Sequence, residues 1–219
     1  MNHQLLGFFS GFPNRHFPHD VAEKLSEELT NRDSLVFISA WPMEYARNDS
    51  DSIGMHHMFE ECNMPFERYY VIDNRTDASY ATQLIREASC VFLMGGHPEQ
   101  QFQLICSKGL DVAIRDTSAA ILGVSAGAIN MAKRSLDTKE SCVPYDGLGL
   151  ADITVKPHFN PEDQQVLSTL LQISMNLPIC ATEDESAIFV KDSRISYTGK
   201  IHWVNKGIIC PFSQRNLLL

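Results

Sequence analysis

Residues 121–130 are Ile-Leu-Gly-Val-Ser-Ala-Gly-Ala-Ile-Asn. An apolar run leads into Ser125, and a helix-forming segment follows it, which fits the pattern Gly-x-Ser-x-Gly between a strand and a helix. Small residues around the serine let the chain turn sharply and present the hydroxyl above the edge of a sheet. The amide of Ala126 then faces a developing oxyanion at the start of the helix. The alternative is an ordinary strand-helix turn whose serine merely caps the helix.

On the N-terminal side of this turn, short apolar runs alternate with longer amphipathic segments. The runs at 5–9, 35–38, 69–72, 90–94 and 119–124 predict strands that are covered on both faces. Helical spacing predicts helices from about residue 20, at 55–62, around 80–85 and past 102–105. Because strands that alternate with helices pair in parallel, we expect a three-layer α/β/α fold with a mostly parallel, doubly wound sheet.

The last third of the chain has a different pattern. A short strand at 153–155 precedes His158, and a helix is expected at 166–175. Apolar segments at 188–190, 195–197 and 202–204, separated by turn residues, predict an antiparallel β meander. We therefore expect a small antiparallel β region at the C-terminal end. No repeat or linker interrupts the chain, so residues 1–219 are predicted to form a single domain.

Composition narrows the classes of partner and location. The 219 residues carry a net charge of -9, which disfavours nucleic acid because duplex binding rests on lysine and arginine. No segment approaches the roughly 20 apolar residues of a membrane helix, and no signal peptide is visible. Six cysteines without Cys-x-x-Cys spacing predict reduced thiols in a cytoplasmic protein. No spacing of histidines and cysteines suggests a metal ligand set, and we expect no cofactor.

A nucleophilic serine needs a base and an acid that orients the base. His158 is the first histidine after Ser125, and it follows a predicted strand. If that strand joins the parallel sheet, His158 lies at the carboxyl edge together with the serine. The acid is expected among Glu183, Asp184 and Glu185, although three carboxylates at a strand end also suit a solvated turn.

Three motifs resemble the peptidase E family, which contains aspartyl dipeptidase and is related to cyanophycinase. They are Gly-Val-Ser-Ala-Gly-Ala at 123–128, Lys-Pro-His-Phe at 156–159 and Gly95-Gly96 after a strand. The resemblance implies a class I amidotransferase-like fold and a serine peptidase with a Ser-His-acid triad. It assigns Ser125 and His158 to the first two roles.

The resemblance leaves the third member of the triad open. It places Asp184 where the family carries glutamate, with Glu183 beside it, and Asp184 is the acid that we expect. Some schemes for the family use an acid between serine and histidine, for which Glu140 or Asp137 qualifies. It also implies an oxyanion hole built from the amides of Gly96 and Ala126.

The sequence departs from aspartyl dipeptidase at the segment after the histidine. Residues 160–165 contain acids but no arginine or lysine to bind an aspartate side chain. We therefore expect substrates with a neutral or basic first residue to be cleaved at least as well as those with aspartate. Arg134 or Lys133, after the serine motif, would be the alternative source of a cation.

The sequence thus predicts a serine-type peptidase that acts on small, dipeptide-like substrates through an acyl-enzyme. An esterase with the same triad is one alternative, and a non-catalytic domain that binds a small ligand is another. The expected partner is a small peptide, with no nucleic acid or membrane, and the chain is expected to be a monomer or homodimer.

Overall fold

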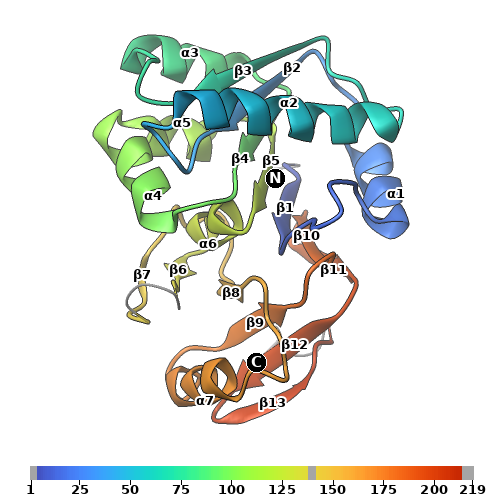
Figure 1. Cartoon of the computed structure of the whole chain (residues 1–219), viewed down its shortest axis with the longest axis vertical. Helices are drawn as coiled ribbons and strands as arrows, with labels where there is room; N and C mark the ends of the chain where they lie inside the picture. The colour runs from blue at the N-terminus through green and yellow to red at the C-terminus, as the bar shows by residue number, and fades with distance from the viewer. Residues whose placement is uncertain (1–3, 138–141, 214–219) are drawn as a thin grey trace.

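The computed structural model describes residues 4–137 and 142–213, which form two principal sheets with helices around them (Figure 1). The larger sheet has seven strands in the order β11-β10-β1-β5-β4-β2-β3. Its parallel strands are β1 (Leu6–Phe9), β2 (Ser34–Ile38), β3 (Arg68–Ile72), β4 (Cys90–Leu93) and β5 (Ala120–Val124). Two antiparallel strands, β10 (Ala187–Lys191) and β11 (Arg194–Thr198), extend it beside β1.

Helices cover both faces of the large sheet, as the three-layer prediction requires (Figure 1). One face carries α1 (His19–Glu28) and α2 (Tyr45–Glu61), and the other carries α3 (Ala78–Glu87), α4 (Pro98–Ser107), α5 (Leu110–Asp116) and α6 (Ala126–Met131). In β2, Val36 and Ile38 join the apolar cluster on the second face, whereas Leu35 and Phe37 join the cluster under α1 and α2. This double burial explains why the strands are continuously apolar.

The second sheet has four strands in the order β13-β12-β9-β8. They are β8 (Val155–Lys156), β9 (Ile179–Thr182), β12 (Ile201–Asn205) and β13 (Ile208–Pro211), and α7 (Gln164–Ile173) packs on them through Leu170. A two-stranded ribbon, β6 (Arg134–Ser135) and β7 (Tyr145–Asp146), completes the elements. No helix in the described part of the chain combines the length and apolar character needed to cross a membrane.

The prediction of one C-terminal meander is wrong, because its strands belong to two different sheets. β10 and β11 pair with each other and β10 pairs with β1, while β12 pairs with β9 and β13. The cores explain the division: Phe189 of β10 fills the core under α1 and α2, whereas Val204 of β12 fills the core under α7. An apolar pattern indicates that a strand is buried but does not select the core that buries it.

Two helical predictions also need correction. The helix expected at 55–62 is longer than predicted, because the polar segment at 48–52 also lies inside α2. Its Asn48 is buried, where its side chain accepts a hydrogen bond from Ser39 Oγ and donates one to Asp73. These tertiary contacts satisfy polar groups that disfavour an exposed helix. The sequence did not predict helix α5, because this helix is short and begins at Leu110, directly after Gly109 and close to the end of α4.

Replacing Gly127 by alanine tests the close approach of α6 to β4. A Cβ at this position would lie 2.1 Å from the carbonyl oxygen of Leu93. We expect Gly127→Ala to lower the free energy of unfolding by about 1–3 kcal/mol, as overpacked cores do. Urea denaturation followed by circular dichroism measures the change.

The matched control is Gly54→Ala in α2, where the added Cβ meets no atom within 4 Å. Alanine there is expected to raise the free energy of unfolding by about 0.5–1 kcal/mol, because glycine is a poor residue inside a helix. Equal denaturation midpoints for the two variants would show that α6 does not depend on this contact.

Candidate active site

Ser125 occupies a strained turn at the carboxyl end of β5. Its backbone has φ 52° and ψ −107°, a conformation that costs a residue with a side chain about 1–3 kcal/mol. The turn is held on both sides: the Ser125 amide donates to the Phe9 carbonyl at 3.0 Å, and its own carbonyl accepts from Ile129 at 3.0 Å. The side chain therefore stands at the edge of the sheet and does not cap α6, since it makes no capping hydrogen bond.

The structure brings Ser125, His158 and Asp184 together in one hydrogen-bonded line. His158 Nε2 lies 2.9 Å from Ser125 Oγ, and His158 Nδ1 lies 2.6 Å from Asp184 Oδ1. These three residues come from different places: Ser125 follows β5 of the large sheet, His158 follows β8 of the second sheet, and Asp184 lies between β9 and β10. The expectation that the strand before His158 joins the parallel sheet is therefore wrong, although the histidine reaches the serine.

Ser10, which the sequence analysis did not identify, holds the histidine in place. It lies directly after β1 and is buried. Its hydroxyl donates to the Thr182 carbonyl at 2.9 Å and accepts from the His158 amide at 2.8 Å. His158 has φ 54°, so this hydrogen bond supports a backbone conformation that is otherwise unfavourable. A serine at the end of a strand has no sequence signal for such a role.

The other candidate acids have different partners. Glu183 Oε1 lies 2.8 Å from His202 Nε2, and Glu185 accepts a hydrogen bond from Asn14 at 2.8 Å. Glu140 lies outside the described residues. Asp137 is buried and lines the same small cavity as Ser125 and His158. Among the acids described, Asp184 is the one that contacts the histidine.

Gly96 and Lys156 line this cavity as well. Gly96 has φ 143° and packs on Trp41, whose Nε1 would lie 2.3 Å from any added Cβ. Its loop is fixed to α6 by the buried Asn130, which donates to the Pro98 carbonyl and to Gln101 at 2.8 and 3.1 Å. Gly96 therefore has a defined position beside Ser125.

Lys156 is a source of positive charge that stands before the histidine, outside the segment at 160–165 that lacks a cation. It is buried, and its Nζ donates to the Pro157 carbonyl. The two cations that the sequence offered point elsewhere: Lys133 pairs with Asp152, and Arg134 pairs with Asp146. The sequence signal that could have identified Lys156 was its position between apolar residues in a short strand.

Residues 10–198 match the model of peptidase family S51. The chain belongs to this family. The matched range begins at Ser10 and includes Ser125, His158 and Asp184. Membership makes the protein a serine-type peptidase and confirms the sequence-based assignment to the peptidase E group. A non-catalytic role for the whole chain is thereby disfavoured.

Two solved structures resemble the fold. One is a peptidase from an acI-B1 actinobacterium, with a TM-score of 0.71 and 17% identity over 97% of this chain and 99% of that chain. The other is a protein of Listeria monocytogenes EGD-e assigned as a peptidase E, with a TM-score of 0.65 and 19% identity over 89% and 98% of the two chains. No curated protein matches the sequence. The predicted fold class is confirmed by these structures.

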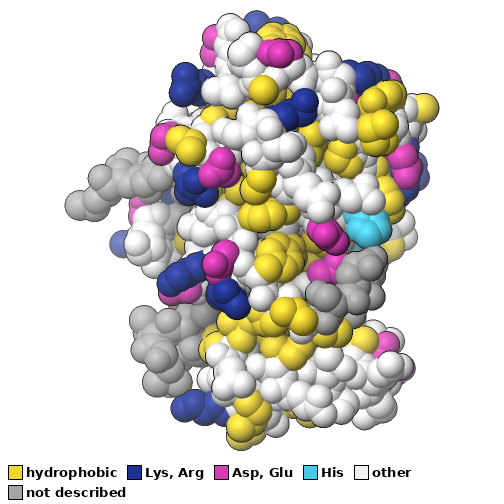
Figure 2. Space-filling view, turned by 90° about the vertical axis from the view of Figure 1, so that its left-hand side faces the viewer, with side chains coloured by type: hydrophobic (Ala, Val, Ile, Leu, Met, Phe, Trp, Pro, Cys, Tyr) yellow, Lys and Arg dark blue, Asp and Glu magenta, His cyan; other side chains and the backbone are white. Residues whose placement is uncertain are grey.

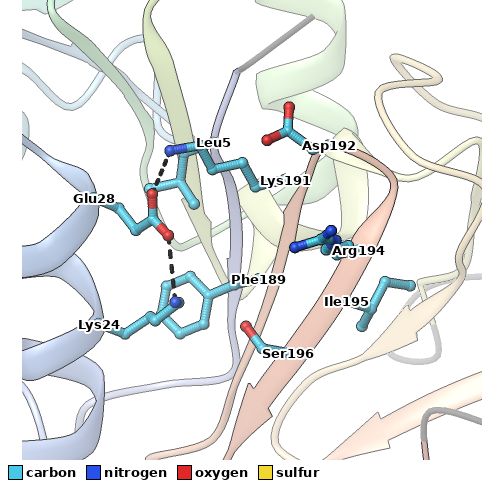
Figure 3. Close-up of a pocket in the computed structure, with 9 residues that line it drawn as sticks. All are labelled: Leu5, Lys24, Glu28, Phe189, Lys191, Asp192, Arg194, Ile195 and Ser196. Carbon is cyan, nitrogen blue, oxygen red and sulfur yellow. Dashed lines mark hydrogen bonds and ion pairs between the residues drawn. The ribbon is translucent and has the colours of Figure 1, made fainter. Parts of the chain in front are cut away.

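Two further hollows lie outside the family's serine site. One, of about 410 Å³, lies between α1 and the strands β10 and β11 (Figure 3). In it Glu28 pairs with both Lys24 and Lys191, and these cations lower the pKa of the Glu28 carboxyl. Because Leu5 and Lys191 mark the amino end of β1, this pocket is at the opposite edge of the sheet from Ser125.

The second hollow is a groove of about 490 Å³ between α4 and β7, lined mainly by Phe102, Val143 and Tyr145. Figure 2 shows the corresponding face, where apolar and acidic side chains lie next to one another. Burial is the main cause that raises the pKa of Tyr145, whose hydroxyl donates to Asn130 at 2.8 Å. Asp137 lines both this groove and the cavity of Ser125.

Metal chemistry has no evident site: the described ranges hold no group of three or more His, Cys, Asp or Glu side chains arranged around a metal position. The six cysteines are free, and Cys90 and Cys180 are buried. Burial raises the pKa of Cys180 to about 12, so this thiol stays protonated and unreactive near neutral pH.

Gly11→Ala tests whether activity depends on the position of the His158–Asp184 pair. An alanine Cβ would lie 2.4 Å from His158 Cε1 and 2.7 Å from Asp184 Oδ1, so the pair has to move. We expect kcat for a peptide substrate to fall about 100-fold, the effect of an ångström-scale displacement of a catalytic group. The control is Asn14→Ala on the same loop, which removes an exposed hydrogen bond to Glu185 and should retain most activity. An unchanged kcat in Gly11→Ala would show that activity does not depend on the position of the His158–Asp184 pair.

Proposed function

We propose that this serine peptidase hydrolyses short, dipeptide-like substrates with Ser125 as nucleophile, His158 as base and Asp184 as the acid that orients the base. The hydrogen-bonded line through the three side chains is the observation that supports these roles. Asp184 faces Nδ1, which favours the tautomer with its proton on Nδ1 and leaves Nε2 free to accept the serine proton. The same arrangement serves unrelated serine hydrolases.

In the proposed reaction, Ser125 Oγ attacks the peptide carbonyl while His158 Nε2 takes the hydroxyl proton. The amides of Gly96 and Ala126 stabilise the oxyanion, an effect worth about 3–4 kcal/mol for one donor in serine proteases. His158 then gives its proton to the leaving amine as the C–N bond breaks. Water, activated by the same histidine, hydrolyses the acyl-enzyme and restores Ser125.

Short substrates are favoured by the charges around the nucleophile. Asp137 and Lys156 are both buried in the cavity that holds Ser125, where each can offer its charge to a nearby polar group of a substrate. Buried charges of this kind stay favourable only when a partner compensates them. The sequence-based expectation that aspartate is not preferred as the first residue stays a prediction. Lys156 is the cation in this cavity that would bind an aspartate side chain if the prediction were wrong.

We place the enzyme in a reducing compartment such as the cytoplasm. The free and buried Cys90 and Cys180 support this location, because buried thiols are common in cytosolic proteins and disulfides are rare there.

A fluorophosphonate probe tests the nucleophile. The native protein should be labelled stoichiometrically on Ser125, and Ser125→Ala should remain unlabelled with an unchanged circular dichroism spectrum. Ser125→Ala and His158→Ala should each abolish hydrolysis, and the double variant should be no worse, because members of a triad act as a unit. If Ser125→Ala keeps more than about one thousandth of wild-type turnover, the serine is not the nucleophile, since triad knockouts cost roughly a millionfold.

The third member is tested by comparing conservative amide variants of neighbouring acids. We expect Asp184→Asn to lower kcat by about 10⁴-fold, as the equivalent change does in a serine protease. Glu183→Gln is the matched control, because Glu183 lies beside Asp184 in sequence but contacts His202. A larger loss in Glu140→Gln than in Asp184→Asn would transfer the role to the segment between serine and histidine.

A further inference from the structure

A second pocket lies next to Ser125, since Val124, which directly precedes the serine, lines it. Its volume is about 200 Å³, and three methionines form much of its wall. We call it the methionine pocket; it is lined by Phe12, Arg15, Ser50, Asp51, Gly54, Met55, Met58, Met94, Gly95 and Val124. Met55 and Met58 come from α2, and Met94 follows β4. Methionine side chains are flexible and polarisable, so such a wall accommodates apolar side chains of different shapes.

The pocket begins one residue away from the nucleophile. Val124 directly precedes Ser125, and a Cβ on Gly95 would lie 3.6 Å from the Ser125 Cβ, an ordinary van der Waals contact. A peptide whose carbonyl carbon is attacked by Ser125 therefore has this pocket within the reach of one residue.

Arg15 supplies the positive charge of the methionine pocket. It is exposed, and its backbone closes a turn by donating to the Phe12 carbonyl at 3.0 Å. Within residues 4–137 and 142–213, its guanidinium forms no ion pair or side-chain hydrogen bond. Asp51, the acid in the same pocket, already pairs with Arg47, whose Nε lies 3.4 Å from its carboxylate. The site therefore offers an arginine fork that suits a carboxylate.

The loop that carries Arg15 also flanks the catalytic histidine. Gly11 lies against His158, close enough that a Cβ there would be 2.4 Å from Cε1 of the ring. In the proposed reaction the leaving amine receives its proton from His158, so the leaving residue lies near this ring. The chain from Gly11 to Arg15 connects that position with the methionine pocket.

We propose that the methionine pocket binds the C-terminal residue of the substrate, the one released as a free amine. Its apolar side chain packs on the methionines, and its α-carboxylate pairs with Arg15. This inference rests on the proposed function and adds a substrate class to it: short peptides that end in an apolar residue with a free carboxylate. Longer peptides and amidated peptides lack the charge at this position.

The first test compares alanyl-leucine with alanyl-leucinamide. Wild-type enzyme should hydrolyse the free acid with a kcat/KM at least about tenfold higher, and Arg15→Gln should reduce this ratio to near one. The control is Arg68→Gln: Arg68 is exposed at the amino end of β3, at the opposite edge of the sheet, and its variant should keep the ratio. A wild-type ratio near one, or an equal loss in Arg68→Gln, overturns the proposal.

The second test fills the pocket. Gly54 lines it and has no atom within 4 Å of an added Cβ, so Gly54→Leu should fold and narrow the space. We expect kcat/KM for alanyl-leucine to fall at least about tenfold relative to alanyl-glycine, because only the larger residue needs the apolar wall. Glu61→Leu is the control: Glu61 is exposed at the end of the same helix, outside the pocket, and its variant should keep this ratio. An unchanged ratio in Gly54→Leu places the leaving residue elsewhere.

A binding experiment separates this inference from the proposed function. On the Ser125→Ala variant, calorimetry should show that acetyl-leucine binds more tightly than acetyl-leucinamide, and that adding Arg15→Gln removes the difference. This pattern without any hydrolysis by the wild-type enzyme would support the subsite and reject the peptidase reaction. Hydrolysis and Ser125 labelling with no preference for the carboxylate would reject the subsite and retain the reaction.

Discussion

The hydroxyl of Ser10 joins the two sheets at the point where the active site is assembled. It donates to Thr182 at the end of β9 and accepts from the His158 amide, while its own backbone continues β1 of the large sheet. The Ser10 side chain is buried, so losing its hydroxyl leaves the His158 amide and the Thr182 carbonyl each without this partner. Ser125 follows a strand of one sheet and His158 follows a strand of the other, and their 2.9 Å contact depends on this junction.

The two residues that meet across the junction both have an unfavourable backbone conformation. Ser125 and His158 both have positive φ values, which few residues other than glycine adopt. Each is fixed by a hydrogen bond from its backbone amide. The Ser125 amide donates to the carbonyl of Phe9 in β1, and the His158 amide donates to Oγ of Ser10, directly after β1. A rigid, buried strand can hold such conformations because its own geometry is set by packing on both faces. β1 therefore supports the whole site.

Charge is distributed unevenly around Ser125. The cavity that contains Ser125 is lined by the buried Asp137 and Lys156, and the neighbouring methionine pocket has an apolar wall with Arg15. A short peptide carries an amine at one end and a carboxylate at the other, so two neighbouring pockets with different charges can orient it.

The sequence by itself determined the layered α/β fold and the turn at Ser125, and it indicated His158 as the candidate base. These features leave local signals: apolar runs show which strands are buried, and Gly-Val-Ser-Ala-Gly places small residues where the chain turns against β4. Only the tertiary structure decided that β10 and β12 lie in different sheets, that Asp184 and not Glu183 contacts the histidine, and that Ser10, Lys156 and Arg15 adjoin the site. The physical reason is that side-chain direction and strand pairing depend on contacts between residues far apart in the chain, for which neighbouring sequence carries no signal.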